Sequence, residues 1–151
     1  MEKFGIGQPV TRVEDQRFTR GAGTYIEDVS LDNETVGVFV RSPHAHARIV
    51  EINKDSINKL PGILAVYSGE DLRMDNIGDI PCGAEINNID GTPCVKPRRP
   101  ALAIDRVRHL GDAVALIVAE TKQQALDAAD QLWIDYEPLD VAVETENSLS
   151  G

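Results

Sequence analysis

The chain has 151 residues, of which 42% are hydrophobic and 26% charged, and its formal net charge at pH 7 is −10. This length and composition predict one folded domain with a core of its own rather than a disordered chain. The negative charge disfavours nonspecific attraction to nucleic acid or to an anionic membrane, because phosphates repel it. No apolar run is long enough to cross a bilayer, and the first residues lack the pattern of a secretory signal, so we expect a cytoplasmic protein.

Residues 1–34 are polar and rich in glycine, and they predict an extended N-terminal arm with turns. The Gly21-Ala22-Gly23 stretch has no strand before it and no helical pattern after it, so it does not predict a phosphate-binding loop. The acidic pairs Glu14-Asp15 and Glu27-Asp28 are adjacent residues whose side chains generally point apart. We expect both pairs to be solvated.

Residues 35–143 predict the folded domain. Alternating or apolar runs indicate strands at 35–41, 47–52 and 63–67. Asp55 is expected to cap a short helix at 56–60, and Ser68 with Asp71 forms the pattern of a capping box that opens another helical turn.

Glycine and proline punctuate residues 73–100, which predict a long excursion with one or two short strands at most. The basic cluster 96–99 lies between prolines and supplies too few charges for a phosphate site, which favours a solvated loop. Cys82 and Cys94 are interpreted as reduced thiols, with a disulfide that closes this loop as the alternative. Two thiolates are too few for an iron–sulfur or zinc set.

The stretch 113–137 organises the domain as strand, helix, strand. Residues 113–119 form an unbroken apolar run, which is typical of a strand covered on both faces. Thr121 predicts an N-cap that pairs with Gln124, followed by a helix with its apolar face on alanines. If the strand at 133–136 is a parallel neighbour of the first strand, the crossover should be right-handed. Short strand pieces are expected at 101–104 and 106–109 and an edge strand at 141–143, and 144–151 is a polar tail or the start of a linker.

Few side chains suggest catalysis. His44 and His46 would face the same way on an extended strand, but no further ligand stands at metal-site spacing, which favours structural hydrogen bonding over zinc or copper. Ser42 lacks the elbow and acid of a serine hydrolase, and His109 has no evident nucleophile partner. Asp135 and Glu137 are interpreted as surface acids that share a strand face. We therefore assign no catalytic, cofactor-binding or metal-binding residue.

Several stretches together resemble one enzyme family. The most distinctive is Arg-Ser-Pro-His-Ala-His-Ala-Arg-Ile at 41–49, and the others lie at 14–18, 21–25, 61–66, 99–103, 107–111, 118–121 and 135–139. In this order they resemble the N-terminal part of the molybdenum-cofactor large subunit of the xanthine dehydrogenase and aldehyde oxidase family. The opening arm is most similar to the carbon monoxide dehydrogenase large-chain branch. The resemblance implies an α+β fold, the α/β hammerhead, with a mixed sheet.

The resemblance also implies an oxidoreductase that uses molybdopterin, with iron–sulfur clusters and FAD on partner subunits. The family's cofactor-binding loops lie downstream of this domain, so we expect no cofactor in this chain and no activity from it alone. Its expected role is to pack against the downstream molybdopterin-binding domains and to dock the iron–sulfur and flavin subunits, with a homo-oligomer also possible. The alternative is a stand-alone interaction or small-ligand-binding domain without redox activity. The substrate, whether carbon monoxide, a purine or an aldehyde, is left open.

Overall fold

The computed structural model describes residues 11–146, and the chain divides into two compact units at Glu34 and Thr35. The first unit contains a one-turn helix, α1 (Asp15–Phe18), and a single 3-10 turn, η1 (Ile26–Asp28). The sequence predicted only extended chain and turns here. Both short elements are closed locally, since Asp15 accepts a hydrogen bond from the Arg12 amide at 3.1 Å and Asp28 from the Tyr25 amide at 2.8 Å.

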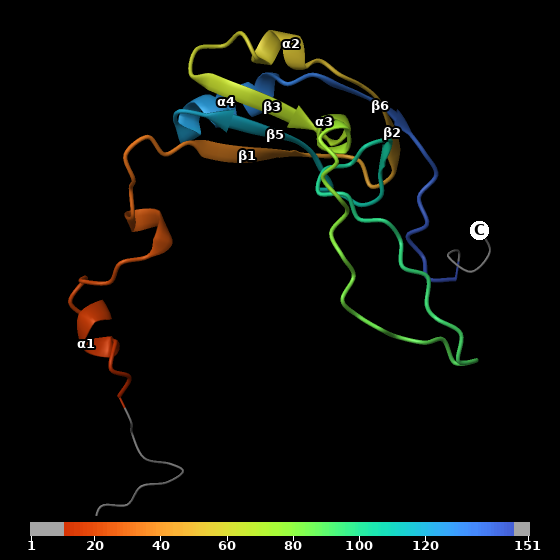
Figure 1. Cartoon of the computed structure of the whole chain (residues 1–151), viewed down its shortest axis with the longest axis horizontal. Helices are drawn as coiled ribbons and strands as arrows, with labels where there is room; N and C mark the ends of the chain where they lie inside the picture. The colour runs from red at the N-terminus through yellow and green to blue at the C-terminus, as the bar shows by residue number, and fades with distance from the viewer. Residues whose placement is uncertain (1–10, 147–151) are drawn as a thin grey trace, which may run out of the picture. The chain divides into compact units, whose positions relative to one another are not determined.

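The second unit carries the sheets (Figure 1). Its elements are β1 (Val36–Arg41), β2 (Ala47–Ile52), α2 (Lys54–Ile57), β3 (Ile63–Ser68), α3 (Gly69–Met74), β4 (Arg106–Val107), β5 (Ala113–Ala119), α4 (Lys122–Gln131) and β6 (Ile134–Pro138). No helix within residues 11–146 combines the length and the apolar character that a membrane span requires.

The strands form two three-stranded sheets, in the orders β1-β5-β3 and β4-β2-β6, and every pair is antiparallel. The α+β class is confirmed, but the expected mixed sheet is wrong. β5 and β6 are not parallel neighbours, because β1 and β3 already occupy both edges of β5. The chain that leaves α4 therefore pairs β6 with β2 in the other sheet.

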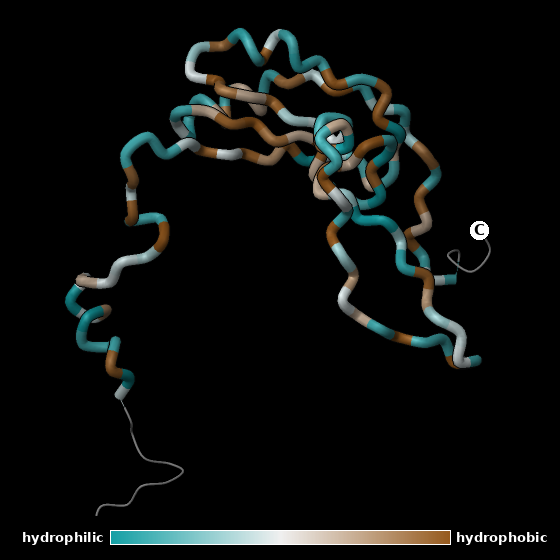
Figure 2. Tube along the Cα trace, viewed as in Figure 1, coloured by the Kyte–Doolittle hydropathy of each residue, from teal (hydrophilic) through white to brown (hydrophobic). Residues whose placement is uncertain are grey.

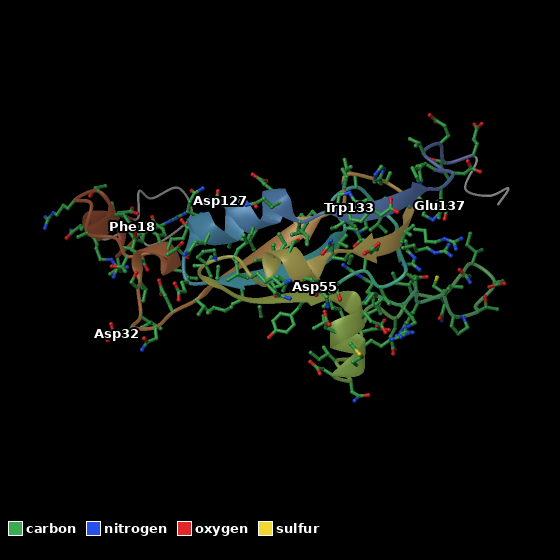
Figure 3. The ribbon with its side chains drawn as sticks, turned by 90° about the horizontal axis from the view of Figure 1, so that it is seen from above. Phe18, Asp32, Asp55, Asp127, Trp133 and Glu137 are labelled. Atoms are coloured by element: carbon green, nitrogen blue, oxygen red, sulfur yellow. The ribbon has the colours of Figure 1, made fainter. Side chains whose placement is uncertain are left out.

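The main core lies between the first sheet and two helices on one of its faces. Ala115, Ile117 and Ala119 of β5 are fully buried against Ala125 and Ala128 of α4, and Ile57 of α2 joins them. Alanine on both surfaces lets the backbone of α4 approach the sheet closely. The opposite side of α4 carries Asp127 and the other polar residues, as the helical period predicted (Figure 3).

The second face of β5 differs from the prediction. Leu116 and Val118 alternate with the buried residues and point to the other side of the sheet, where they are only partly buried. Phe39 and Tyr67 flank Leu116 on the neighbouring strands and are 49% and 40% exposed. Within the described residues of the second unit, no helix covers this face. We call the five residues Phe39, Ala65, Tyr67, Leu116 and Val118 the bare face.

The helix caps predicted from the sequence are confirmed where the capping side chain bonds to a backbone amide within one helical turn. The Ser68–Asp71 capping box is present, and Thr121 Oγ1 accepts a hydrogen bond from the Gln124 amide at 3.3 Å. Asp55 does not cap a helix, because α2 begins earlier, at Lys54, and includes it.

Two expected strands are absent from the described structure. Residues 101–104 make one ladder-like bond, from the Ala103 amide to the Ala113 carbonyl at 2.7 Å, without forming a strand. Residues 141–143 pair with no strand either.

The excursion between α3 and β4 leaves the sheets as a long open loop (Figures 1 and 2). Its only described ladder contact is a bridge between Asn87 and Pro93. Figure 2 shows hydrophobic colour at several points along this loop. Four of its isoleucines are at least half exposed, namely Ile77, Ile80, Ile86 and Ile89.

Candidate functional site

Two loops meet where the sheets join, and Ser42 ties them together. The Ser42 amide donates to the Asp112 carbonyl at 2.8 Å, and the Gly111 amide donates to the Ser42 carbonyl at 2.9 Å. Ser42 Oγ accepts the His44 amide at 2.9 Å, and the side chain is buried. A hydroxyl occupied in this way stabilises a turn and does not form a nucleophile elbow.

The two histidines of the 41–49 motif do not share an extended strand. Residues 42–46 form a bent connection between β1 and β2, so the predicted common facing has no basis. The His44 ring packs against Tyr136, with ring centroids 5.0 Å apart. His46 Nδ1 lies 2.7 Å from the Asp140 carbonyl oxygen and so bridges two distant loops, which is the structural role expected for it.

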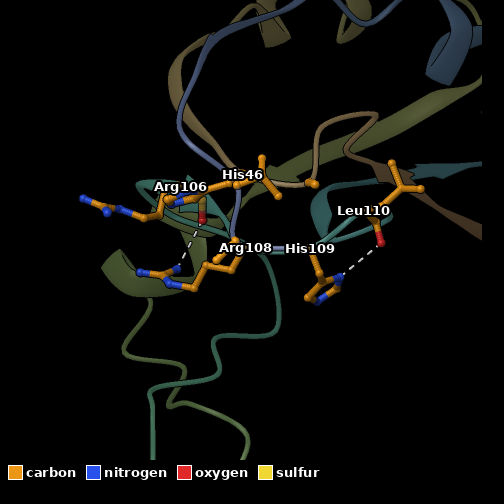
Figure 4. Close-up of a pocket in the computed structure, with 8 residues that line it drawn as sticks. His46, Arg106, Arg108, His109 and Leu110 are labelled. Atoms are coloured by element: carbon orange, nitrogen blue, oxygen red, sulfur yellow. Dashed lines mark hydrogen bonds between the residues drawn. The ribbon is translucent and has the colours of Figure 1, made fainter. Parts of the chain in front are cut away.

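Tertiary structure brings His46 and His109 to one groove of about 490 Å³ (Figure 4). Arg106 and Arg108 line it too, and Arg108 Nη1 donates to the Arg106 carbonyl at 3.2 Å. His109 Nε2 lies 3.5 Å from Asp112 Oδ1. Within residues 11–146, no three potential metal ligands gather, so the two imidazoles lack the further ligands that zinc requires.

A second groove, of about 390 Å³, is basic. Arg41, Arg98, Arg99 and Arg108 line it, together with Asp112. Arg98 pairs with Asp79 at 2.6 Å, and this guanidinium lowers the pKa of the Asp79 carboxyl. Such a concentration of arginine is unusual in a chain with a net charge of −10. Sequence analysis found only the 96–99 cluster, because no spacing signals that Arg41 and Arg108 lie beside it.

Tyr136 carries a buried hydroxyl that makes no hydrogen bond of normal geometry with the described residues. Burial raises the pKa of Tyr136, and the Asp112 carboxylate adds to this increase, while the nearby Ser42 hydroxyl acts in the opposite direction. The Tyr136 ring also contacts the His44 ring, which helps to fix the position of the hydroxyl. No motif in the sequence indicated this site.

The remaining residues singled out in the sequence are acidic pairs and a glycine that lie at the surface or in turns. Glu137, at the end of β6 in Figure 3, pairs with Arg48 at 3.2 Å on the surface, and Asp135 is partly buried. The Glu14-Asp15 and Glu27-Asp28 pairs lie in the first unit, largely exposed except for a partly buried Asp15, and Gly21 adopts a positive φ in a turn.

The thiols do not fit an iron–sulfur cluster. Cys82 and Cys94 are free, and the Cys94 thiol donates to Asn88 Oδ1 at 3.1 Å. Neither belongs to a group of three potential ligands among the described residues. Clusters of this kind require four cysteine or histidine ligands, so this donor set cannot hold one.

The comparisons with known proteins agree with each other. Residues 20–140 match the family model described as "Aldehyde oxidase and xanthine dehydrogenase, a/b hammerhead domain". The chain is 39% identical over 140 residues to the carbon monoxide dehydrogenase large chain of Afipia carboxidovorans, covering 93% of this chain and 16% of that one. It is 34% identical over 146 residues to the nicotine 6-hydroxylase large subunit of Paenarthrobacter nicotinovorans, covering 97% and 17%. The crystal structure of quinoline 2-oxidoreductase from Pseudomonas putida 86 superposes with a TM-score of 0.80 at 34% identity, covering 99% of this chain and 18% of that chain.

The fold and these matches define the class: an α+β hammerhead domain built on two small antiparallel sheets. The chain belongs to the aldehyde oxidase and xanthine dehydrogenase family. It corresponds to one region of the family's large subunits and spans about a sixth of the length of these two relatives.

Proposed function

We propose that this chain serves as the hammerhead domain of a molybdenum hydroxylase large subunit and that its role there is to pack against the cofactor-binding domains and the partner subunits. The bare face carries the proposal. β5 is apolar on both sides, yet on the side of Leu116 and Val118 only Val114, at the start of the strand, is fully buried within the second unit. A contiguous apolar surface of this kind on a soluble domain marks an interface.

The rows across the sheet show how this surface is built. Phe39, Leu116 and Tyr67 stand side by side on β1, β5 and β3, and Val118 pairs with Gly37 and Ala65 in the next row. The absence of a side chain at Gly37 leaves space for Leu116, because a Cβ at Gly37 would lie only 3.3 Å from Leu116 Cδ1. The result is an apolar platform of aromatic and aliphatic side chains that suits close packing with another protein surface.

The excursion supplies a second apolar surface. Its isoleucines stand among turn-forming residues and have no helix or sheet face in which to be buried. Docked on a neighbouring domain they would lose contact with water, which favours association. The redox chemistry of such an enzyme belongs to the molybdenum cofactor and to iron–sulfur and flavin groups, and we place their binding in the other domains and subunits.

A chimeric enzyme tests this role. This chain replaces the corresponding segment of the Afipia carboxidovorans carbon monoxide dehydrogenase large chain, and assembly with the partner subunits is measured by size-exclusion chromatography. We expect the chimera to assemble, and Phe39→Glu with Tyr67→Glu to abolish assembly while leaving the denaturation midpoint of the 151-residue chain nearly unchanged. The control is Gln123→Glu with Gln131→Glu on the polar face of α4, which adds the same charge.

Amide hydrogen exchange gives a second measurement. We expect the excursion around Ile77 to Ile89 to exchange quickly in the 151-residue chain and slowly in the assembled chimera. A chimera that fails to assemble, or one that assembles equally well with both bare-face substitutions, would contradict the packing role.

A further inference from the structure

We propose that the basic groove beside Arg41 and Arg99 binds an extended acidic polypeptide segment of a partner protein, with an aspartate or glutamate carboxylate between these two guanidinium groups. The groove has a volume of about 390 Å³, and its lining also includes the apolar residues Ile80, Pro97 and Pro100. The groove adjoins the bare face, since the Arg41 guanidinium lies over the Phe39 ring, but its lining contains no bare-face residue.

The charges within the groove are not balanced. Arg98 pairs with Asp79 at 2.6 Å, and Arg108 lies 3.6 Å from Asp105. No carboxylate of residues 11–146 lies within salt-bridge distance of Arg41 or Arg99. The one acid in the groove, Asp112, is already engaged, since its Oδ2 accepts the Arg108 amide at 3.1 Å. Two arginines therefore remain available for an anion from outside.

Arg41 is also held in position before any ligand binds. The β1–β5 register shifts between Val40 and Arg41, and such bulges re-aim side chains at the end of a strand. Arg41 Nη1 donates to the Gly111 carbonyl at 2.9 Å, and its guanidinium lies 5.8 Å from the centre of the Phe39 ring. One donor is used on a carbonyl oxygen, so the charge is not neutralised and the other donors of the guanidinium are free. A side chain held in this way loses less conformational entropy on binding.

The apolar walls favour a polypeptide over a free anion. A small anion at exposed arginines gains little, because water and salt screen the attraction. An acidic peptide can pack its own side chains against the apolar residues of the groove. Its carboxylate can then bind the two guanidinium groups, where bidentate geometry strengthens the hydrogen bonds. Nucleic acid fits poorly, since two uncompensated arginines are too few to neutralise a run of backbone phosphates.

The test uses the 151-residue chain and a synthetic probe, acetyl-(Glu-Ala)3-amide, with binding followed by NMR of the arginine Nε–H groups at low salt. We expect saturable shifts at Arg41 and Arg99, and no binding of acetyl-(Lys-Ala)3-amide. Arg41→Gln with Arg99→Gln should weaken the binding of the glutamate peptide by at least about tenfold, since each substitution removes hydrogen bonds to a charged group.

The matched control is Arg48→Gln with Arg73→Gln, which removes the same charge from arginines that pair with Glu137 and Glu70 outside the groove. We expect less than about a twofold effect from it, because exposed charges at a distance are screened. The Arg99 side chain makes no hydrogen bond or ion pair with the described residues, so the single variant Arg99→Gln should weaken binding even if the double variant disturbs the Gly111 loop. Equal weakening by the control, absence of saturable binding, or full displacement by an equal concentration of inorganic phosphate would overturn the proposal.

Discussion

The two sides of β5 should respond very differently to the loss of a side chain. Ile117 is completely buried and stands between Val38 and Val66 on the neighbouring strands, beneath the alanines of α4. Ile117→Ala removes three carbons, which corresponds to about 2.4 kcal/mol of transfer free energy. The closely packed alanines leave α4 little freedom to collapse, so a cavity term should raise the loss in the free energy of unfolding to about 3–4 kcal/mol.

Val118, the next residue, provides the comparison. It lies on the bare face and is partly exposed in the folded chain. Val118→Ala should therefore cost only about 1 kcal/mol or less, since its methyl groups are in partial contact with water already. The apolar run at 113–119 led us to expect a strand covered on both faces, on which Val118→Asp would unfold the domain. Because Val118 is only partly buried, Val118→Asp should be tolerated far better than Ile117→Asp.

Urea denaturation followed by the fluorescence of Trp133, the single tryptophan, measures both changes. The m-value should stay constant, so that a shift of the midpoint reports stability alone. Equal losses for Ile117→Ala and Val118→Ala would refute the one-sided burial of β5 and, with it, the bare face.

Four further predictions concern sites away from β5. Gly69→Ala should cost about 1–3 kcal/mol, because its Cβ would lie 2.5 Å from the Ala103 carbonyl oxygen, whereas Gly78→Ala meets nothing and should be silent in the same urea assay. Burial acts to raise the pKa of Asp71, but hydrogen bonds from Lys54 and Ser68 outweigh it, so the pKa is lowered from 3.8. The stability that Asp71 contributes is therefore present above about pH 4 and lost as the pH falls further, and Asp71→Asn should flatten the acid limb of a stability–pH curve. Tyr136→Phe should be neutral or stabilising by up to about 1 kcal/mol, because it removes an unbonded buried hydroxyl, and a clear loss of thermal stability would show that the hydroxyl has a partner. His44→Ala with His46→Ala should leave the zinc content unchanged in elemental analysis, since His46 Nδ1 is engaged with the Asp140 carbonyl, and a zinc ion lost in the variant would reverse this view.

The elements that the sequence predicted well depend on contacts within a few residues. Thr121 begins α4 and Ser68 begins α3 because each cap bonds to an amide three residues on. The strands at 36–41, 47–52 and 63–68 follow from alternation and from their flanking turns. The one-turn helix at 54–57 was displaced, since a single turn gives a weak periodic signal and Asn53, not Asp55, precedes it.

The pairing of strands was decided only by tertiary structure. The pattern at 113–137 is the same whether β5 and β6 share a sheet or not, because a strand–helix–strand pattern records periodicity and not partners. The occupation of both edges of β5 by β1 and β3 placed β6 in the second sheet.

The sequence by itself determined the family and the order of most strands and helices. Tertiary structure decided which side of each element is covered and which distant residues meet. It left Leu116 and Val118 only partly buried, and it brought Arg41, from the end of β1, to the same groove as Arg99, from the excursion. The physical reason is range: hydrogen-bonded caps and periodicity are local in sequence, whereas burial and the clustering of charge depend on contacts between segments that only the folded chain brings together.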